Sequence, residues 1–73
     1  MIMKIIYESF GEKLKFLRKK NNIGQLALAK KIGVGKSIIS MWENGICEPT
    51  LSRFVAVAKY FGVTTDYLAG LTE

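Results

Sequence analysis

The sequence predicts an all-α domain, a compact bundle of five short helices preceded by a short N-terminal segment. Apolar residues recur at three- and four-residue spacing along most of the 73-residue chain, which is the period of helices that bury one face. Glycine, asparagine and proline interrupt this pattern at short intervals, as expected where helices end and begin. A chain of this length has room for one small domain and no second one.

The first helix is expected to begin after Ser9, which precedes Glu12 by three residues. This is the spacing of a capping box, in which each side chain accepts a hydrogen bond from the other residue's backbone N–H. An apolar stripe follows at i, i+4 and i+7, formed by Phe10, Leu14 and Leu17. The pair Asn21-Asn22 ends this helix, because asparagine favours turns.

Two short helices joined by a tight turn are expected next, over residues 25–32 and 36–44. Gly33 ends the first and Gly45 ends the second, because glycine suits the left-handed position that follows a helix. The first of them is only two turns long, so it must pack on its neighbours to be stable. Two short helices with a three-residue turn that contains glycine form a helix-turn-helix motif.

Two further helices are expected before the C-terminus. Pro49 and Thr50 open the first, and Gly62 ends it. Its apolar residues follow the helical period, and they are Leu51, Phe54, Val55, Ala58 and Phe61. Thr64 can cap a short last helix, in which Asp66 occupies the positively polarised first turn. The apolar side of that helix consists of Tyr67, Leu68 and Leu71.

The first eight residues form an apolar arm in this prediction, and residues 9–73 form the helical domain. Residues 1–7 read MIMKIIY, and their Ile and Tyr content favours a strand, while the apolar pattern also permits a backward extension of the first helix. We expect a short strand or an extended arm. The segment is short and interrupted by Lys4, so it does not read as a signal peptide or a membrane span.

Composition excludes most kinds of chemistry. The chain has no His and one Cys, Cys47, so it lacks the ligands of a zinc site and the general base of a Ser or Cys hydrolase. We therefore expect no metal, no cofactor, no small-molecule ligand and no enzymatic activity. A single free thiol fits a reducing compartment, and we expect a cytoplasmic protein. A redox role for Cys47 is the weaker alternative, because no cation flanks it.

Positive charge is concentrated in one half of the chain. The sequence has 11 Lys and Arg against 6 Asp and Glu, a net charge of +5. The stretch from Lys13 to Trp42 holds most of these cations and no acidic residue. Such a block is either a solvated face that keeps a small domain soluble or a face that binds a polyanion, and we favour the second interpretation.

The helix over residues 36–44 decides between these interpretations. Ile39 and Trp42 share one side of its helical wheel. The opposite side carries Ser37, Ser40, Met41 and Asn44. Short polar side chains suit close approach to phosphates and base edges, and apolar ones such as Ile38 suit contact with thymine methyl groups. An ordinary amphipathic helix facing water has a similar composition, but the basic block and the tight turn favour DNA.

Four short stretches of the sequence carry a resemblance to a known family. They are QLALAKKIGV over residues 25–34, ISMWENG over residues 39–45, Glu48-Pro49, and Phe61-Gly62-Val63. In this order they resemble the Cro/C1-type (XRE family) helix-turn-helix domain of phage repressors and bacterial regulators, over roughly residues 11–70. The resemblance implies a bundle of the lambda-repressor-like type, encoded by a bacterium or a phage, that binds operator DNA as a dimer.

The resemblance also implies roles for single residues. Base contacts in the major groove fall to Lys36, Ser37, Ile38 and Met41. Phosphate contacts are expected from Gln25, Ser40, Asn44 and Lys13. A helix N-terminus at Gln25 independently favours a phosphate, because its free N–H groups attract anions. Arg18 and Glu43 look like the family's partly buried ion pair, which ties the first helix to the end of the third.

The function expected is sequence-specific binding of double-stranded DNA by a homodimeric transcription regulator, with repression as the expected direction. Paired helices about one DNA turn, roughly 34 Å, apart read palindromic half-sites. Candidates for the dimer interface are Tyr67, Leu68, Leu71, Ile2 and Ile5, and the alternative for all of them is packing inside the domain. The alternative function is a protein-interaction module, such as an antitoxin-like or anti-repressor component, which the apolar Leu26, Ile38 and Ile46 support.

Overall fold

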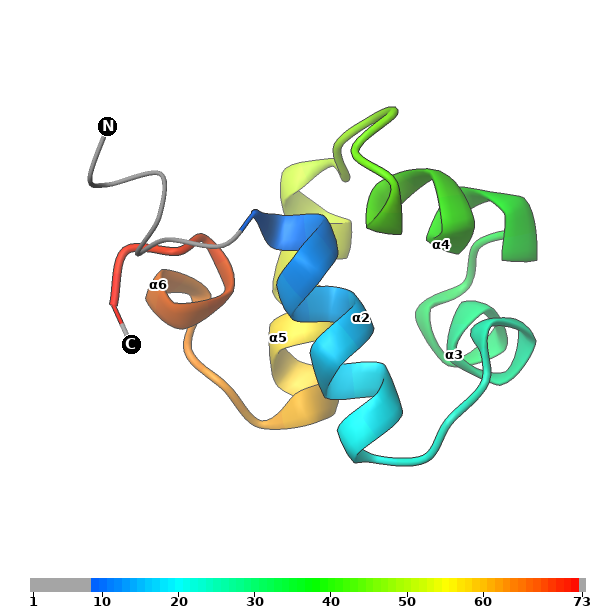
Figure 1. Ribbon diagram of the computed structural model, residues 1–73, viewed down its shortest axis with the longest axis horizontal. Coiled ribbons are helices and arrows are strands. Elements are labelled where there is room, and N and C mark those ends of the chain that lie inside the picture. Colours follow the sequence, from blue (N-terminus) through cyan, green and yellow to red (C-terminus); the bar gives the residue numbers. More distant parts are fainter. Residues whose placement is uncertain (1–8, 73) are drawn as a thin grey trace.

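The computed structural model describes residues 9–72, which form five helices and no strand. The helices are α2 (Phe10–Lys20), α3 (Gln25–Ile32), α4 (Lys36–Glu43), α5 (Leu51–Phe61) and α6 (Thr65–Leu68). Figure 1 shows α6 at one end of the molecule and the α3–α4 pair at the other, with α2 between them. The predicted all-α class is confirmed. The expectations for the arm, including Ile2 and Ile5 at an interface, lie outside the described residues.

Local signals set the helix boundaries. The Ser9 backbone N–H donates to Glu12 Oε1 at 3.1 Å, and the Glu12 N–H donates to Ser9 Oγ at 3.2 Å, so the predicted capping box is formed. The hydroxyl oxygens of Thr50 and Thr64 accept backbone N–H groups at the starts of α5 and α6, at 3.3 and 3.0 Å. Gly33 ends α3 with a φ of 89°, in the left-handed region that favours glycine.

Ser9→Ala is expected to lower the free energy of unfolding by about 1 kcal/mol, because the Glu12 N–H loses its side-chain acceptor. Thermal unfolding measures the effect, which corresponds to a melting temperature lower by roughly 4–8 °C in a domain of this size. Ser37→Ala is the matched control, since Ser37 is also exposed near a helix start but Gly35 is the N-cap of α4. Equal losses in the two variants would contradict the capping role of Ser9.

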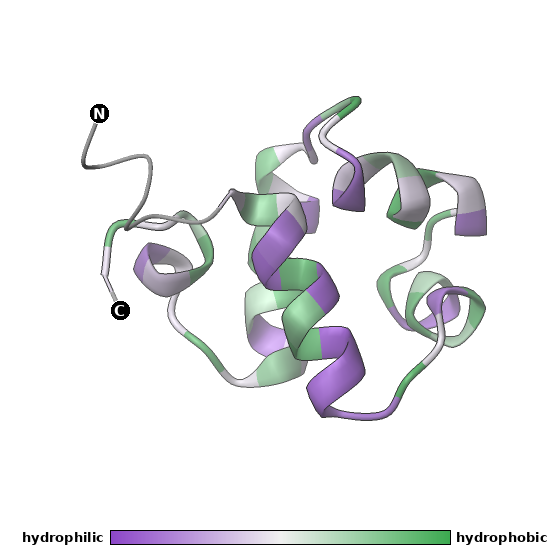
Figure 2. Cartoon of the chain, in the orientation of Figure 1, coloured by the Kyte–Doolittle hydropathy of each residue, from purple (hydrophilic) through white to green (hydrophobic). Residues whose placement is uncertain are grey.

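One apolar core joins the helices, and Figure 2 shows polar residues over much of the outside of α2. The core residues are Leu14, Leu17, Leu28, Ala29, Ile39, Trp42, Val57, Ala58 and Leu68. The Phe10 ring lies at the edge of this core, and its centroid is 5.8 Å from the ring centroid of Trp42 and 5.5 Å from that of Phe54. Leu68 is fully buried, so its prediction as an interface residue is wrong. A chain this small uses such apolar side chains for its own core.

Gly11 sets how closely α2 approaches the end of α4. Gly11 is buried, and a Cβ at this position would lie 2.2 Å from the Trp42 carbonyl oxygen and 2.9 Å from that of Glu43. Both neighbours are backbone atoms, which cannot move aside as a flexible side chain does. Glycine is therefore required where these two helices cross. Within residues 9–72, no helix is both long and apolar enough to cross a membrane.

Candidate nucleic-acid interface

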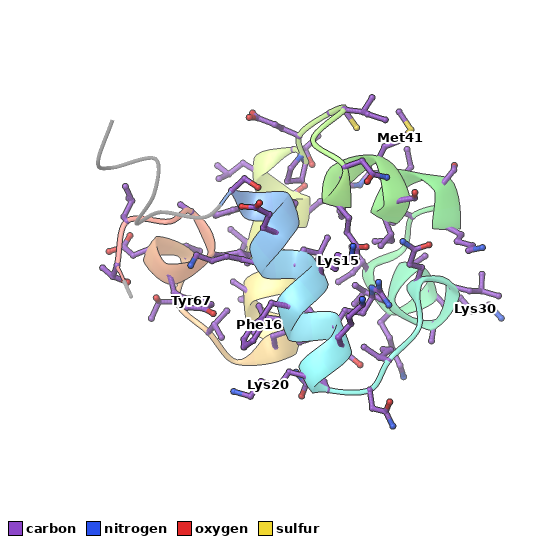
Figure 3. All side chains as sticks on the ribbon, viewed as in Figure 1. Lys15, Phe16, Lys20, Lys30, Met41 and Tyr67 are labelled. Atoms are coloured by element: carbon purple, nitrogen blue, oxygen red, sulfur yellow. The ribbon has the colours of Figure 1, made fainter. Side chains whose placement is uncertain are left out.

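The helix α4 is fixed to the core by one side and presents the other to solvent. Ile39 and Trp42 are 0% and 2% exposed and anchor the inner side. Lys36, Ser37 and Asn44 are exposed, and Ser40 and Met41 are half-buried. Figure 3 shows Met41 pointing away from the bundle. Ile38 is half-buried and packs partly against the core, so only part of its side chain is available to a partner.

An ion pair holds the end of α4 against α2. Arg18 Nε donates to Glu43 Oε2 at 2.6 Å, and Arg18 Nη2 donates to Glu43 Oε1 at 3.1 Å. The two side chains are 12% and 4% exposed, so water screens the pair weakly. Arg18 Nη1 also donates to the Ile23 carbonyl oxygen at 3.2 Å. One guanidinium group thus joins α2, the α2–α3 turn and the end of α4.

Gln25, the first residue of α3, belongs to the same network. Its Nε2 donates to Glu43 Oε1 at 3.1 Å, the oxygen that also accepts from Arg18 Nη2. This carboxylate therefore links the start of α3 to the end of α4 across the motif. This contact is not predictable from the sequence, because two residues 18 positions apart share no local pattern.

Two of the predicted phosphate contacts meet at the C-terminal end of α4. Asn44 Nδ2 donates to the Ser40 carbonyl oxygen at 2.9 Å and lies 3.4 Å from Ser40 Oγ.

Gly24, at the start of α3, offers no side-chain cap, so the free N–H groups of that helix are open to an anion. Lys30 and Lys31 are exposed in the last turn of α3, and Figure 3 shows Lys30 projecting from it.

Lys13 does not lie on this surface. Lys13 is only 8% exposed. Its Nζ is 4.5 Å from the ring centroid of Tyr67 in α6, an attractive cation–π geometry. Figure 3 places Tyr67 at the end of the molecule opposite Lys30. The prediction of Lys13 as a phosphate contact is therefore wrong. The sequence already indicated the inward position of Lys13, because Lys13 lies three residues after Phe10 and therefore on the same side of the helix.

Comparison with known proteins identifies the motif. A family model described as "Helix-turn-helix domain" matches residues 11–73. The chain belongs to this helix-turn-helix family. Repressor protein C2 of Salmonella phage P22 is 40% identical to this helix-turn-helix domain over 58 residues, which cover 80% of this chain and 27% of that protein. The transcriptional activator BcrR of Enterococcus faecalis is 39% identical over 59 residues, 81% of this chain and 29% of that protein.

Solved structures share the fold of this helix-turn-helix domain. The P22 c2 repressor in complex with a synthetic operator matches with a TM-score of 0.84 and 35% identity, over 89% of this chain and 98% of that chain. The biofilm regulator SinR in complex with DNA matches with a TM-score of 0.74 and 28% identity, over 81% of this chain and 95% of that chain. The predicted resemblance to Cro/C1-type domains and the lambda-repressor-like fold are confirmed. These relatives are transcription regulators, and two of them, the P22 c2 repressor and SinR, are seen in complex with DNA. The chain spans less than a third of the two curated proteins named above.

Proposed function

We propose that this domain binds double-stranded DNA in a sequence-specific manner as a transcription regulator, with α4 in the major groove. The observation that carries the proposal is the outward side of α4, where short side chains stand on a helix fixed by a buried core and by the network around Glu43. In this arrangement Lys36, Ser37, Ile38 and Met41 contact base edges, and Gln25, Ser40 and Asn44 contact phosphates. The fold shared with an operator-bound repressor supports the same arrangement.

Selection of bound duplexes from a random pool tests this proposal, followed by affinity measurements over a range of salt concentrations. We expect one recovered motif, and a logarithm of affinity that falls linearly with the logarithm of salt, by about 0.9 for each phosphate neutralised. A domain that binds no duplex at low salt would refute DNA binding and point to a protein-interaction module instead.

Base-reading and phosphate-contacting residues are expected to behave differently when replaced. Lys36→Ala or Ser37→Ala should reduce discrimination between the selected duplex and a duplex with one changed base pair by about 1–3 kcal/mol. Gln25→Ala should weaken both duplexes about equally, because a phosphate contact carries no base information. Lys59→Ala is the control for charge, since Lys59 is an exposed lysine on α5. Equal loss of discrimination in all three interface variants would contradict the assignment.

We also propose that the domain acts as a homodimer on a palindromic operator. A helix of eight residues is about 12 Å long and spans few base pairs, so two copies on two half-sites extend the sequence that is read. Leu71 is 67% exposed and stays a candidate for the interface, as does the half-buried Tyr67. Ile46, between α4 and α5, and Leu51, the first residue of α5, are 67% and 78% exposed and add a second apolar surface.

Analytical ultracentrifugation with the selected duplex measures the stoichiometry of the complex. We expect two domains on a palindromic duplex and one on an isolated half-site, with the half-site bound more weakly. Leu71→Ser and Ile46→Ser then show which of the two apolar surfaces forms the dimer interface. The variant at that interface should still bind the first domain to the duplex but should lose the binding of the second. A single domain on the palindromic duplex at saturation would contradict the homodimer.

A further inference from the structure

An aromatic ring lies among lysines on the side of α2 that faces solvent. Phe16 is 53% exposed, and Lys20 Nζ lies 5.9 Å from its ring centroid. A shallow open hollow of about 490 Å³ surrounds it, and we call its lining the α2 outer face: Glu12, Lys15, Phe16, Lys19 and Lys20. Figure 3 shows Lys15, Phe16 and Lys20 along this helix. The α2 outer face thus combines one exposed aromatic ring with three lysines, and such a cluster of positive charge is complementary to an acidic partner.

The positive charges of the α2 outer face have no counterpart in the described part of the chain. Among residues 9–72, the ion pair present joins Arg18 to Glu43, on another side of α2. Glu12 is the acidic member of the α2 outer face, and its carboxylate already accepts the Ser9 N–H in the capping box. The three lysines are exposed, so their ammonium groups are free to pair with carboxylates of a second molecule.

The α2 outer face is separate from the DNA-binding surface. Residues two apart on a helix differ in direction by about 200°, so Phe16 lies nearly opposite Arg18 on α2. Arg18 points to the end of α4, where it meets Glu43, and Gly11 abuts the carbonyl oxygen of Trp42. DNA on the outward side of α4 therefore leaves Phe16 uncovered, and this surface remains available in a DNA complex.

We propose that the α2 outer face binds an acidic segment of a partner protein that places one large apolar side chain against Phe16. Exposed ion pairs alone contribute little to affinity, whereas an aromatic anchor covered by its partner contributes much of it. The lysines then fix the position of the segment and favour acidic partners over others. Single-stranded nucleic acid fits less well, because proteins that bind it stack successive bases on several aromatic side chains, and this face has one. The inference does not depend on the proposed DNA binding.

A short fluorescent peptide of Asp and Glu with one central Trp is the probe, and fluorescence anisotropy measures its binding to the full chain. We expect saturable binding that Phe16→Ala weakens about tenfold, with Lys19→Glu weakening it as well. Leu26→Ala is the matched control, because Leu26 is also 53% exposed but lies on α3. It should bind the peptide as the unmodified chain does. Circular dichroism checks that each variant is folded.

Two comparisons make the test decisive. A peptide with Trp replaced by Ser should bind about tenfold more weakly, and Phe16→Ala should leave affinity for duplex DNA unchanged. Equal binding of the two peptides, or equal binding by Phe16→Ala and the unmodified chain, would overturn the proposal, because attraction between charges alone would then explain the contact. Equal weakening of peptide and DNA by Phe16→Ala would also overturn it and assign this face to nucleic acid.

Discussion

Gly11→Ala is expected to destabilise the domain by about 3 kcal/mol or more, the largest effect we predict for a single methyl group. In an ordinary helix, replacing glycine by alanine stabilises by up to about 1 kcal/mol. Here the added Cβ would stand 2.2 Å from the Trp42 carbonyl oxygen, so α2 and α4 must separate. Separation opens the core around Trp42, and this cost outweighs the gain in helix propensity.

Thermal and urea unfolding measure this effect, and the melting temperature is expected to fall by more than about 10 °C. Gly24→Ala is the matched control, because no atom lies within 4 Å of the Cβ that it would add. Gly24 is the N-cap of α3, so this control should lose no more than about 1 kcal/mol. If Gly11→Ala is as stable as the unmodified domain, the close packing of α2 on α4 is refuted.

Glu43→Ala is expected to cost about 3 kcal/mol, because it leaves the Arg18 guanidinium largely buried without a counter-charge. Arg18 is 12% exposed, so water replaces the lost carboxylate poorly. Gln25 loses its acceptor in the same variant, and with it the hydrogen bond that joins the start of α3 to the end of α4. We therefore expect weaker binding of the selected duplex even at temperatures where the variant is folded.

Urea unfolding of single and double variants separates the effect of the buried charge on stability from the effect of packing. Glu48→Ala, at an exposed carboxylate, is the control and should change stability by less than about 0.5 kcal/mol. Replacing both Arg18 and Glu43 by Met should restore much of the stability lost in Glu43→Ala, because no unpaired charge is then buried. A double variant that is less stable than Glu43→Ala would show that packing, and not the buried charge, dominates.

Features of the fold that depend on residues close together in the sequence were predictable. The capping box at Ser9 and the left-handed glycine at position 33 act within one helical turn, so their spacing alone locates the ends of α2 and α3. The inward position of Ile39 and Trp42 followed from the helical period of α4, and the structure buries both. The ion pair of Arg18 and Glu43 came from the family resemblance and not from any local pattern.

Features that depend on how the helices meet were not predictable in this way. Gly11 reads as an ordinary helical residue until the carbonyl groups of α4 are placed beside it. Leu68 lies in a helix of four residues, which is too short for its period to separate a core side from an interface side. The ammonium group of Lys13 is placed by Tyr67, which is distant in sequence and becomes its neighbour only when α6 packs on α2.

Mapping of backbone amide chemical shifts by NMR, during titration with the selected duplex, locates the DNA-binding surface directly. We expect the largest changes at the start of α3 and along the outward side of α4, at Gln25, Lys36, Ser37, Met41 and Asn44. The amides next to Phe16 should change little. Changes that concentrate on α6 or on the α2 outer face, with α4 unaffected, would contradict the proposal that α4 enters the major groove.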